Sequence, residues 1–280
     1  MYPVLIQIGG FTVTSFGVMM ALAFLVAGWV ASRELARVGL DPEHAWDMVG
    51  YAAVFGILGS KIYYMILNWQ DTAADPMRAL LSRSGLVWYG GLILAAAVIA
   101  WRVKKTGIPL GRMADASALA LAVGYAIGRM GCFLVGDDYG RPSDLPWAVA
   151  FPKGAPPSTA ANLREFGVDI PASVPDNTVY AVHPTQLYEV GMSLIIFFIL
   201  KRVQPRMAVP GMLFMLWVAL AGVERFIVEI FRAKDDRFLG LLTVAQLISV
   251  LLTIAGVAGV AYLARRAASA PAATRRTAAA

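Results

Sequence analysis

The chain has 280 residues, of which 59% are apolar and only 15% are charged. Soluble domains average about 25% charged residues, so this composition excludes an ordinary soluble domain as well as a disordered chain. The 26 glycines and 15 prolines fit a polytopic membrane protein, whose helices pack through small residues. A single cysteine, Cys132, excludes an intramolecular disulfide framework and a multi-cysteine zinc site. The excess of 24 Lys and Arg over 18 acidic residues is typical of cytoplasmic loops that face anionic lipid, and we expect no nucleic-acid partner.

A helix needs roughly 20 mostly apolar residues to cross the membrane, and seven windows meet that requirement. They are 12–31, 44–67, 86–103, 113–135, 187–201, 210–231 and 240–264. The polar segment 137–182, between the fourth and fifth windows, predicts a small loop domain outside the membrane. Residues 265–280 are predicted to be a basic, disordered cytoplasmic tail. The sequence therefore predicts an all-α polytopic integral membrane protein with about seven transmembrane helices in one domain, 1–264.

The distribution of basic residues predicts the orientation. Outside the predicted spans, twelve Lys and Arg fall on one side of the membrane and eight on the other. By the positive-inside rule, the N-terminus lies outside and the C-terminus in the cytoplasm. The loops 137–182 and 232–239 then lie on the outer face. No charged segment precedes the first span, so we expect no cleaved signal peptide.

Charged side chains inside spans are functional candidates, because each costs at least about 2.5–3.5 kcal/mol near the bilayer centre. The first such place is Gly128-Arg129-Met130-Gly131, near the outer end of the fourth span. Gly124, Gly128 and Gly131 share one helix face, which favours either close helix packing or the approach of a lipid head group. Arg129 must find an anion or extend to the interface.

The second place is the end of the sixth span, where Arg225, Glu229 and Arg232 share one helical stripe. A structural ladder of ion pairs is one interpretation. The other interpretation is a phosphate site. Two arginines share one carboxylate of the stripe, which leaves positive charge free for a phosphate, and arginine binds phosphate in a bidentate manner. Glu224 lies off this stripe.

The third place is the start of the fifth span, where His183 and Pro184 precede Gln186, Tyr188 and Glu189. A helix N-terminus favours a bound anion. The alternative is that His183 only caps the helix. Lys61 and Tyr89 lie at the outer ends of the second and third spans, so all of these polar residues are expected on one face.

These motifs together resemble those of the prolipoprotein diacylglyceryl transferase family. The order and spacing agree across most of the chain, and the family also has seven spans with the N-terminus outside. The resemblance rests on Gly128-Arg129-x-Gly131 followed by Gly140-Arg141-Pro142, on His183-Pro184-Thr185-Gln186-Leu187-Tyr188-Glu189, on Arg225-Phe226-Ile227-Val228-Glu229-x-Phe231-Arg232, and on the shorter blocks Gly59-x-Lys61-Ile62-x-Tyr64 and Tyr89-Gly90-Gly91.

The resemblance implies transfer of the sn-1,2-diacylglyceryl group from phosphatidylglycerol to the thiol of the lipobox cysteine in preprolipoproteins. This reaction forms a thioether and releases glycerol 1-phosphate. It is the first step of bacterial lipoprotein maturation at the inner membrane. The implied partners are phosphatidylglycerol, preprolipoprotein signal peptides and membrane lipid, with no cofactor and no metal. Such a reaction needs cations for the leaving phosphate and a proton acceptor for the thiol.

The resemblance also implies roles for particular residues, while the identity of the base stays open. The expected catalytic residues are Arg129, Arg225, Tyr89, His183 and Glu229. The expected contacts for phosphatidylglycerol are Arg129, Arg225, Arg232, Lys61, Gly128, Gly140, Gln186, Tyr188 and Glu189. The chain departs from the usual residues of the family at Cys132, Val135 and Asp137. The alternative function is therefore a polytopic phospholipid-binding protein that is inactive or has altered specificity.

Overall fold

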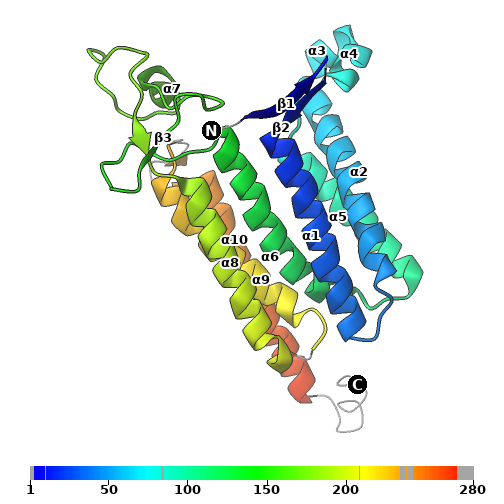
Figure 1. Cartoon of the computed structure of the whole chain (residues 1–280). Coiled ribbons are helices and arrows are strands. Elements are labelled where there is room, and N and C mark those ends of the chain that lie inside the picture. The colour runs from blue at the N-terminus through cyan, green and yellow to red at the C-terminus, as the bar shows by residue number, and fades with distance from the viewer. Residues whose placement is uncertain are drawn as a thin grey trace.

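The chain folds into a bundle of long helices that run between two ends of the molecule (Figure 1). The computed structural model describes residues 3–9, 11–82, 85–207, 209–233, 237–238 and 242–269. The long helices are α1 (Ser15–Arg37), α2 (Glu43–Leu67), α5 (Trp88–Thr106), α6 (Leu110–Val135), α8 (Thr185–Val203), α9 (Met212–Phe231) and α10 (Val244–Ser269). Each of the seven predicted windows therefore coincides with a long helix.

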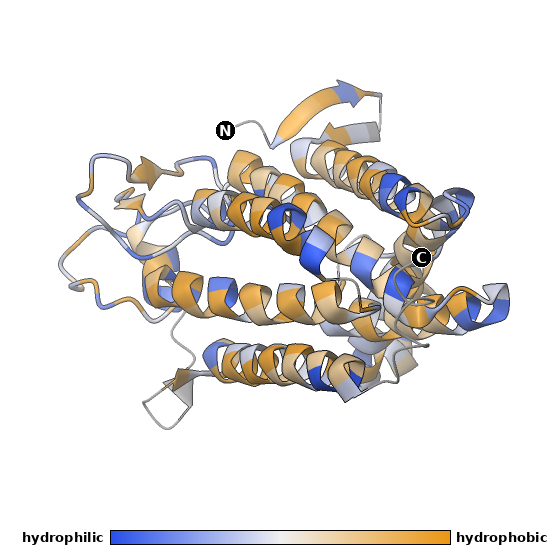
Figure 2. Ribbon diagram, turned by 90° about the horizontal axis from the view of Figure 1, so that it is seen from below, coloured by the Kyte–Doolittle hydropathy of each residue, from blue (hydrophilic) through white to orange (hydrophobic). Residues whose placement is uncertain are grey.

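Four of the described helices, α1, α2, α6 and α10, are long and apolar enough to cross a membrane. Helices α5, α8 and α9 are only 19 or 20 residues long and each carry three charged residues, so none of them contains an 18-residue stretch with fewer than three charges. Figure 2 shows apolar residues around most of the circumference of the long helices, with polar residues mainly near their ends. Large apolar side chains such as Leu25, Val54, Ile195 and Leu251 are exposed, as expected of surfaces that face lipid.

Short elements lie in the connections. The helices are α3 (Trp69–Ala74), α4 (Pro76–Leu81), α7 (Ala160–Glu165) and the 3-10 turn η1 (Gln204–Arg206). Within the described residues, antiparallel pairing joins strand β1 (Val4–Ile8) to β2 (Phe11–Thr14), β3 (Val149–Ala150) to β4 (Ala181–Val182), and β5 (Arg237–Phe238) to β6 (Leu242–Thr243). We call the end of the bundle that carries β1, β2, α3, α4 and the segment 137–182 the loop end, and the end where α10 finishes the tail end (Figure 1).

Two boundaries and the all-α prediction need correction. Residues 12–14 belong to strand β2, and the first helix begins only at Ser15, where the Thr14 side chain accepts a hydrogen bond from the N–H of Gly17. At the other terminus α10 continues to Ser269, so residues 265–269 are helical instead of disordered. Alanine and arginine are strong helix formers, which explains the extension. The remainder of the predicted tail, 270–280, lies outside the described residues.

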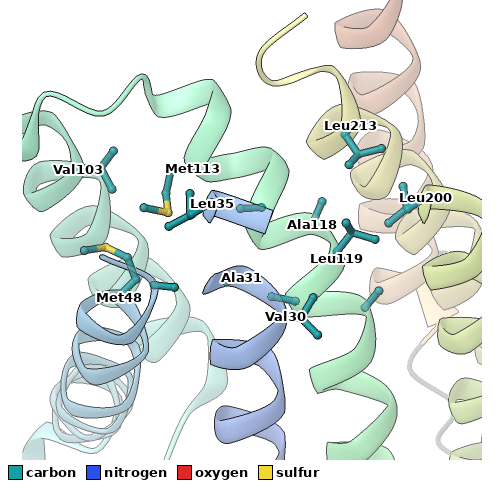
Figure 3. Packing of buried hydrophobic residues seen from close by; sticks show 14 of the residues in the cluster. Val30, Ala31, Leu35, Met48, Val103, Met113, Ala118, Leu119, Leu200 and Leu213 are labelled. Atoms are coloured by element: carbon teal, nitrogen blue, oxygen red, sulfur yellow. The ribbon is translucent and has the colours of Figure 1, made fainter. Parts of the chain in front are cut away.

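The helices pack in a defined order. Helix α1 packs on α6, α6 on α8, and α9 on α10, whereas α2 pairs with α5 beside α1. The main core lies toward the tail end, where Leu35 of α1, Leu119 of α6, Leu200 of α8 and Leu213 of α9 are buried together (Figure 3). The loop end is therefore left for polar side chains.

The segment 137–182 has its own small core. Tyr139, Phe151, Leu163 and Val182 are buried together, and the rings of Tyr139 and Phe151 stack with centroids 5.5 Å apart. Burial raises the pKa of Tyr139 to about 12, and its hydroxyl donates to the carbonyl of Pro157 at 2.7 Å. The segment therefore packs as a compact unit at the loop end of the bundle.

Candidate active site

Gly140 joins the three motifs that the sequence singles out. Its N–H donates to the carbonyl of His183 at 2.9 Å, and the N–H of Arg141 donates to the carbonyl of Phe231 at 2.9 Å. Gly140 also forms a bridge with Arg232. A side chain at position 140 would collide with the Phe231 carbonyl and approach the His183 Cβ to 2.8 Å. Glycine is therefore required where the segment after α6 passes between the start of α8 and the end of α9.

Asp138 binds two arginines from distant parts of the chain, Arg129 of α6 and Arg232 directly after α9. Its Oδ2 lies 3.0 Å from Nη1 of Arg129 and 2.9 Å from Nη1 of Arg232, and its Oδ1 contacts Nη2 of Arg232. Burial by itself raises the pKa of Asp138, but the guanidinium groups of Arg232 and Arg129 bring the net pKa below its usual value. Asp138 is therefore an anion that fixes both arginines.

Glu189 joins the next pair of arginines. Its side chain is only 1% exposed, and Oε2 pairs with Nη2 of Arg129 while Oε1 lies 3.6 Å from Nη1 of Arg225. The hydroxyl of Tyr125 donates to Oε1 at 2.7 Å. A carboxylate buried this deeply needs such charge-assisted partners to remain ionised.

Glu229 of α9 completes the set of ion pairs. Glu229 Oε2 lies 2.6 Å from Nη2 of Arg225 and 3.6 Å from Nε of Arg232. We define the arginine cluster as Arg129, Arg225 and Arg232 with their carboxylate partners Asp138, Glu189 and Glu229.

The expectation of unpaired positive charge on the stripe is wrong. The predicted ion pairs do form, but Glu189 of α8 and Asp138 of the following loop neutralise the remaining charge. Arg225 is the most accessible of the three arginines, with a side chain 32% exposed against 12% for Arg129 and 14% for Arg232.

The first turn of α8 holds the segment that follows α6. Thr185 Oγ1 donates to the carbonyl of Asp138 at 2.8 Å, and Nε2 of the fully buried Gln186 donates to the carbonyl of Asp137. Asp138 has a positive φ of 59°, which an aspartate tolerates better than most residues. Burial raises the pKa of the neighbouring Asp137, in contrast to Asp138. Gln186 thus supports the loop that carries the ionised Asp138.

His183 and Tyr188 form a separate aromatic group. The Tyr188 hydroxyl lies 3.0 Å from Nδ1 of His183 and accepts a hydrogen bond from Trp147 Nε1 at 2.9 Å. Because indole nitrogen only donates, the Tyr188 proton is available to His183 Nδ1. Burial lowers the pKa of His183, which favours the neutral ring. The alternative of a side-chain cap is wrong, since α8 begins after Pro184 without a capping side chain.

Lys61 and Tyr89 lie outside the arginine cluster. Lys61 Nζ donates to the carbonyl oxygen and Oγ of Ser82, at 2.8 and 2.6 Å, and lies over the ring of Tyr64. Tyr89 is half exposed at the start of α5 and contacts the ring of Trp88 edge-on. Neither residue makes an ion pair or hydrogen bond to the cluster in the described contacts, so their roles stay predictions.

The glycines of α6 divide between the two interpretations. A Cβ at Gly131 would lie 3.0 Å from the Cβ of Met19, and one at Gly124 would lie 3.3 Å from the Cβ of Ala27, so both pack against α1. A Cβ at Gly128 would meet nothing within 4 Å. Close packing therefore explains Gly124 and Gly131, while Gly128 faces open space.

Sequence reasoning missed two members of the site and one acid outside it. Asp138 belongs to the arginine cluster, and Tyr125 binds Glu189. Glu224, only 6% exposed, makes no described ion pair with the cluster and accepts hydrogen bonds from Ser193 Oγ at 2.8 and 3.0 Å. Asp138 lies two residues after Gly136, just past the end of the fourth predicted span, and this position is a signal that the sequence offers. The partnership of Glu224 with Ser193 depends on how α8 faces α9, and no local pattern reveals it.

Comparison with known proteins agrees with the motifs. The family model for prolipoprotein diacylglyceryl transferase matches residues 3–262. The phosphatidylglycerol–prolipoprotein diacylglyceryl transferase of Trichormus variabilis is 30% identical over 93% of this chain and 89% of its own length. The enzymes of that name from Vibrio vulnificus and Geobacter sulfurreducens are both 31% identical, over 94% of this chain and 92% and 96% of their own lengths. The chain belongs to the prolipoprotein diacylglyceryl transferase family.

Proposed function

We propose that this multi-pass membrane protein transfers the diacylglyceryl group of phosphatidylglycerol to a cysteine thiol of a prolipoprotein. The names of the relatives state this activity, and their similarity covers nearly the whole chain. The structural observation that carries the proposal is the convergence of Arg129 and Arg225, from α6 and α9, on one buried carboxylate, Glu189. Two neighbouring guanidinium groups can stabilise the negative charge of the phosphate that leaves in this reaction.

The chemistry needs one proton acceptor and stabilisation of one leaving group. The cysteine sulfur forms a bond to a glycerol carbon as the carbon–oxygen bond to phosphate breaks, and glycerol 1-phosphate departs with the bonding electrons. The thiol must lose its proton, because the thiolate is the nucleophile. Arginine side chains at the phosphate stabilise the charge that develops there.

We assign Glu189 as the acceptor of the thiol proton. A phosphate that binds Arg129 and Arg225 competes with Glu189 for their guanidinium groups. Arg225, the most exposed arginine, offers the first contact. Once phosphate binds Arg225 and Arg129, Glu189 loses the cations that stabilise its charged form and accepts a proton more readily. Binding of the lipid thereby prepares the base for the thiol.

The other cluster residues support this exchange. Tyr125 holds Glu189 through Oε1, and Asp138 with Arg232 keeps Arg129 in place after Glu189 is protonated. Glu229 orients Arg225 from one turn further along α9. His183, Tyr188 and Gly140 lie beside the end of α9 and are proposed to line the site for the polar head group.

We propose seven spans, formed by the seven long helices, in the inner membrane of a bacterium. Residues 1–264 would form the catalytic domain, with the segment 137–182 on the outer face and the C-terminus in the cytoplasm. The distribution of basic residues supports this orientation. Reporter fusions test it: a reporter active only outside the cytoplasm should work after Pro156 and fail after Arg266. The opposite pattern would reverse the topology.

The activity is tested with purified protein, vesicles of phosphatidylglycerol and a lipobox peptide. We expect a peptide mass increased by one diacylglyceryl group and an equal amount of glycerol 1-phosphate. A lipobox peptide with serine in place of cysteine is the negative control. Saturable binding of phosphatidylglycerol without a thioether product would instead identify a lipid-binding protein.

A further inference from the structure

Asp115 of α6 caps the beginning of another helix, α9. Its Oδ2 accepts a hydrogen bond from the N–H of Gly211 at 2.8 Å, and its Oδ1 accepts one from the N–H of Phe214 at 2.9 Å. The residue that precedes α9, Gly211, has no side chain with which to cap the helix itself. Free N–H groups at a helix start require acceptors, most of all away from water, and here a distant carboxylate supplies them.

The same two helices touch through their backbones one turn earlier. A Cβ at Gly111 would lie 2.7 Å from the carbonyl carbon of Pro210 and 2.9 Å from the nitrogen of Gly211. Gly111 and Asp115 are separated by one helical turn on α6. The close approach and the two hydrogen bonds together prevent α9 from sliding along α6 at the tail end.

The hydrogen bond between Asp115 and Gly211 lies equally far along each helix from the two arginines that contact Glu189. Arg129 follows Asp115 by fourteen residues on α6, and Arg225 follows Gly211 by fourteen residues on α9. The two helices run in the same direction from this contact, so each arginine is about 21 Å further along its helix, at roughly 1.5 Å per residue. Both guanidinium groups contact Glu189, so any movement of α9 along α6 would change the position of Arg225 relative to Arg129.

We propose that Asp115 is a positioning residue: it sets the axial register of α9 against α6 and thereby the spacing of Arg129 and Arg225. Its effect on transfer rests on the proposed function, whereas its effect on register does not. Because it lies three to four turns of helix from the site, Asp115 acts only through the two helices that it joins. Loss of the cap would leave α9 free to shift along its axis, and one residue of slip moves Arg225 by about 1.5 Å.

Glu34 offers a matched control at the same end of the bundle. It is a buried acid, 4% exposed, and lines the same small pocket as the partly buried Asp115. Lys201, Arg37 and Gln204 bind its carboxylate, which joins α1 to the end of α8. Substitution of Glu34 therefore removes a carboxylate that joins two helices at the same end of the bundle, without releasing the start of α9.

Distances between spin labels on α6 and α9 measure the register directly. In a Cys132→Ser background, labels would replace the exposed Leu121 and Ile227, and pulsed electron paramagnetic resonance would be recorded in lipid nanodiscs. We expect Asp115→Ala to shift or broaden the distance distribution, Asp115→Asn to change it less because one carbonyl acceptor remains, and Glu34→Ala to leave it unchanged. A distribution for both Asp115 variants that superimposes on the parent would overturn the proposal, as would an equal change in Glu34→Ala.

The kinetic consequence is measured in the same membranes. We expect kcat/KM for transfer to fall at least tenfold in Asp115→Ala, with partial retention in Asp115→Asn and little change in Glu34→Ala. If the register shifts while kcat/KM stays at the parent value, the positioning role is wrong and the proposed function stands. If the parent itself makes no thioether, the proposed function fails, and the distance measurement still decides the register.

Discussion

Asp138 binds Arg232 through both of its carboxylate oxygens and shares one of them with Arg129. One loop residue thus connects the loop ends of α6 and α9, two helices that are distant in sequence. Asp138 and Glu189 together form ion pairs with all three arginines of the cluster. The arginine cluster is therefore a neutralised site in which a substrate anion competes with carboxylates of the protein.

Removal of either arginine that binds Glu189 should abolish transfer. We expect Arg129→Ala and Arg225→Ala to lower kcat/KM on the order of 10²–10³-fold, because stabilisation of the leaving phosphate is lost. Lysine at either position should restore little activity, since a point charge does not reproduce the guanidinium fork. Arg33→Ala, which changes an exposed arginine of α1, is the control. Near-normal turnover by an alanine variant would remove that arginine from the mechanism.

Glu189→Gln separates lipid binding from proton transfer. The amide cannot accept the thiol proton, so we expect kcat to fall by about 10²–10⁴-fold. Binding of phosphatidylglycerol should stay equal or become tighter, because the competing anion is gone. Equilibrium binding to vesicles and steady-state kinetics measure the two effects. Glu224→Gln, at the acid hydrogen-bonded to Ser193, is the control, and parental kcat in Glu189→Gln would exclude this residue as the base.

Asp138 should make the stability of the protein sensitive to acid. Its pKa in the folded state is lower than the ordinary value of 3.8, so its contribution is present above pH 3.8 and is lost as pH falls through the folded-state pKa. We expect Asp138→Asn to lower Tm by several degrees at pH 7 and to differ less from the parent below about pH 4. Thermal unfolding in detergent measures this, with the exposed Asp144→Asn as control. A Tm difference that is constant with pH would contradict it.

Cys132 is not expected to be a nucleophile, although its Sγ lies 3.5 Å from Nη1 of Arg129. The reactive thiol comes from the substrate, and a thioether on Cys132 would have no good leaving group. Cys132→Ser should retain most activity. Cys132→Asn should be tolerated, because the cysteine and asparagine side chains fill a similar volume. Turnover and intact-protein mass spectrometry are the measurements. Loss of transfer in a folded Cys132→Ser protein, together with a lipid adduct on Cys132 in the parent, would overturn this view.

Several features of the fold could be predicted because they depend on local properties of the chain. Apolar windows of membrane length located all seven long helices, since helix formation in lipid follows from the need to pair backbone groups within one segment. The motifs around Arg129, His183 and Arg225 indicated the family, which the comparisons confirm. The β1–β2 hairpin was missed because its apolar residues merge with those of the first helix, so hydropathy alone shows no boundary.

The sequence by itself determined the helices, the family and the residue types of the site, because these reside in continuous stretches of chain. Only the tertiary structure decided which charges neutralise one another. The stripe of Arg225, Glu229 and Arg232 has surplus positive charge on its own helix, but Asp138 and Glu189 approach it from other segments. Ion pairs depend on distances of a few ångströms between side chains, and the packing of α6, α8 and α9 sets those distances.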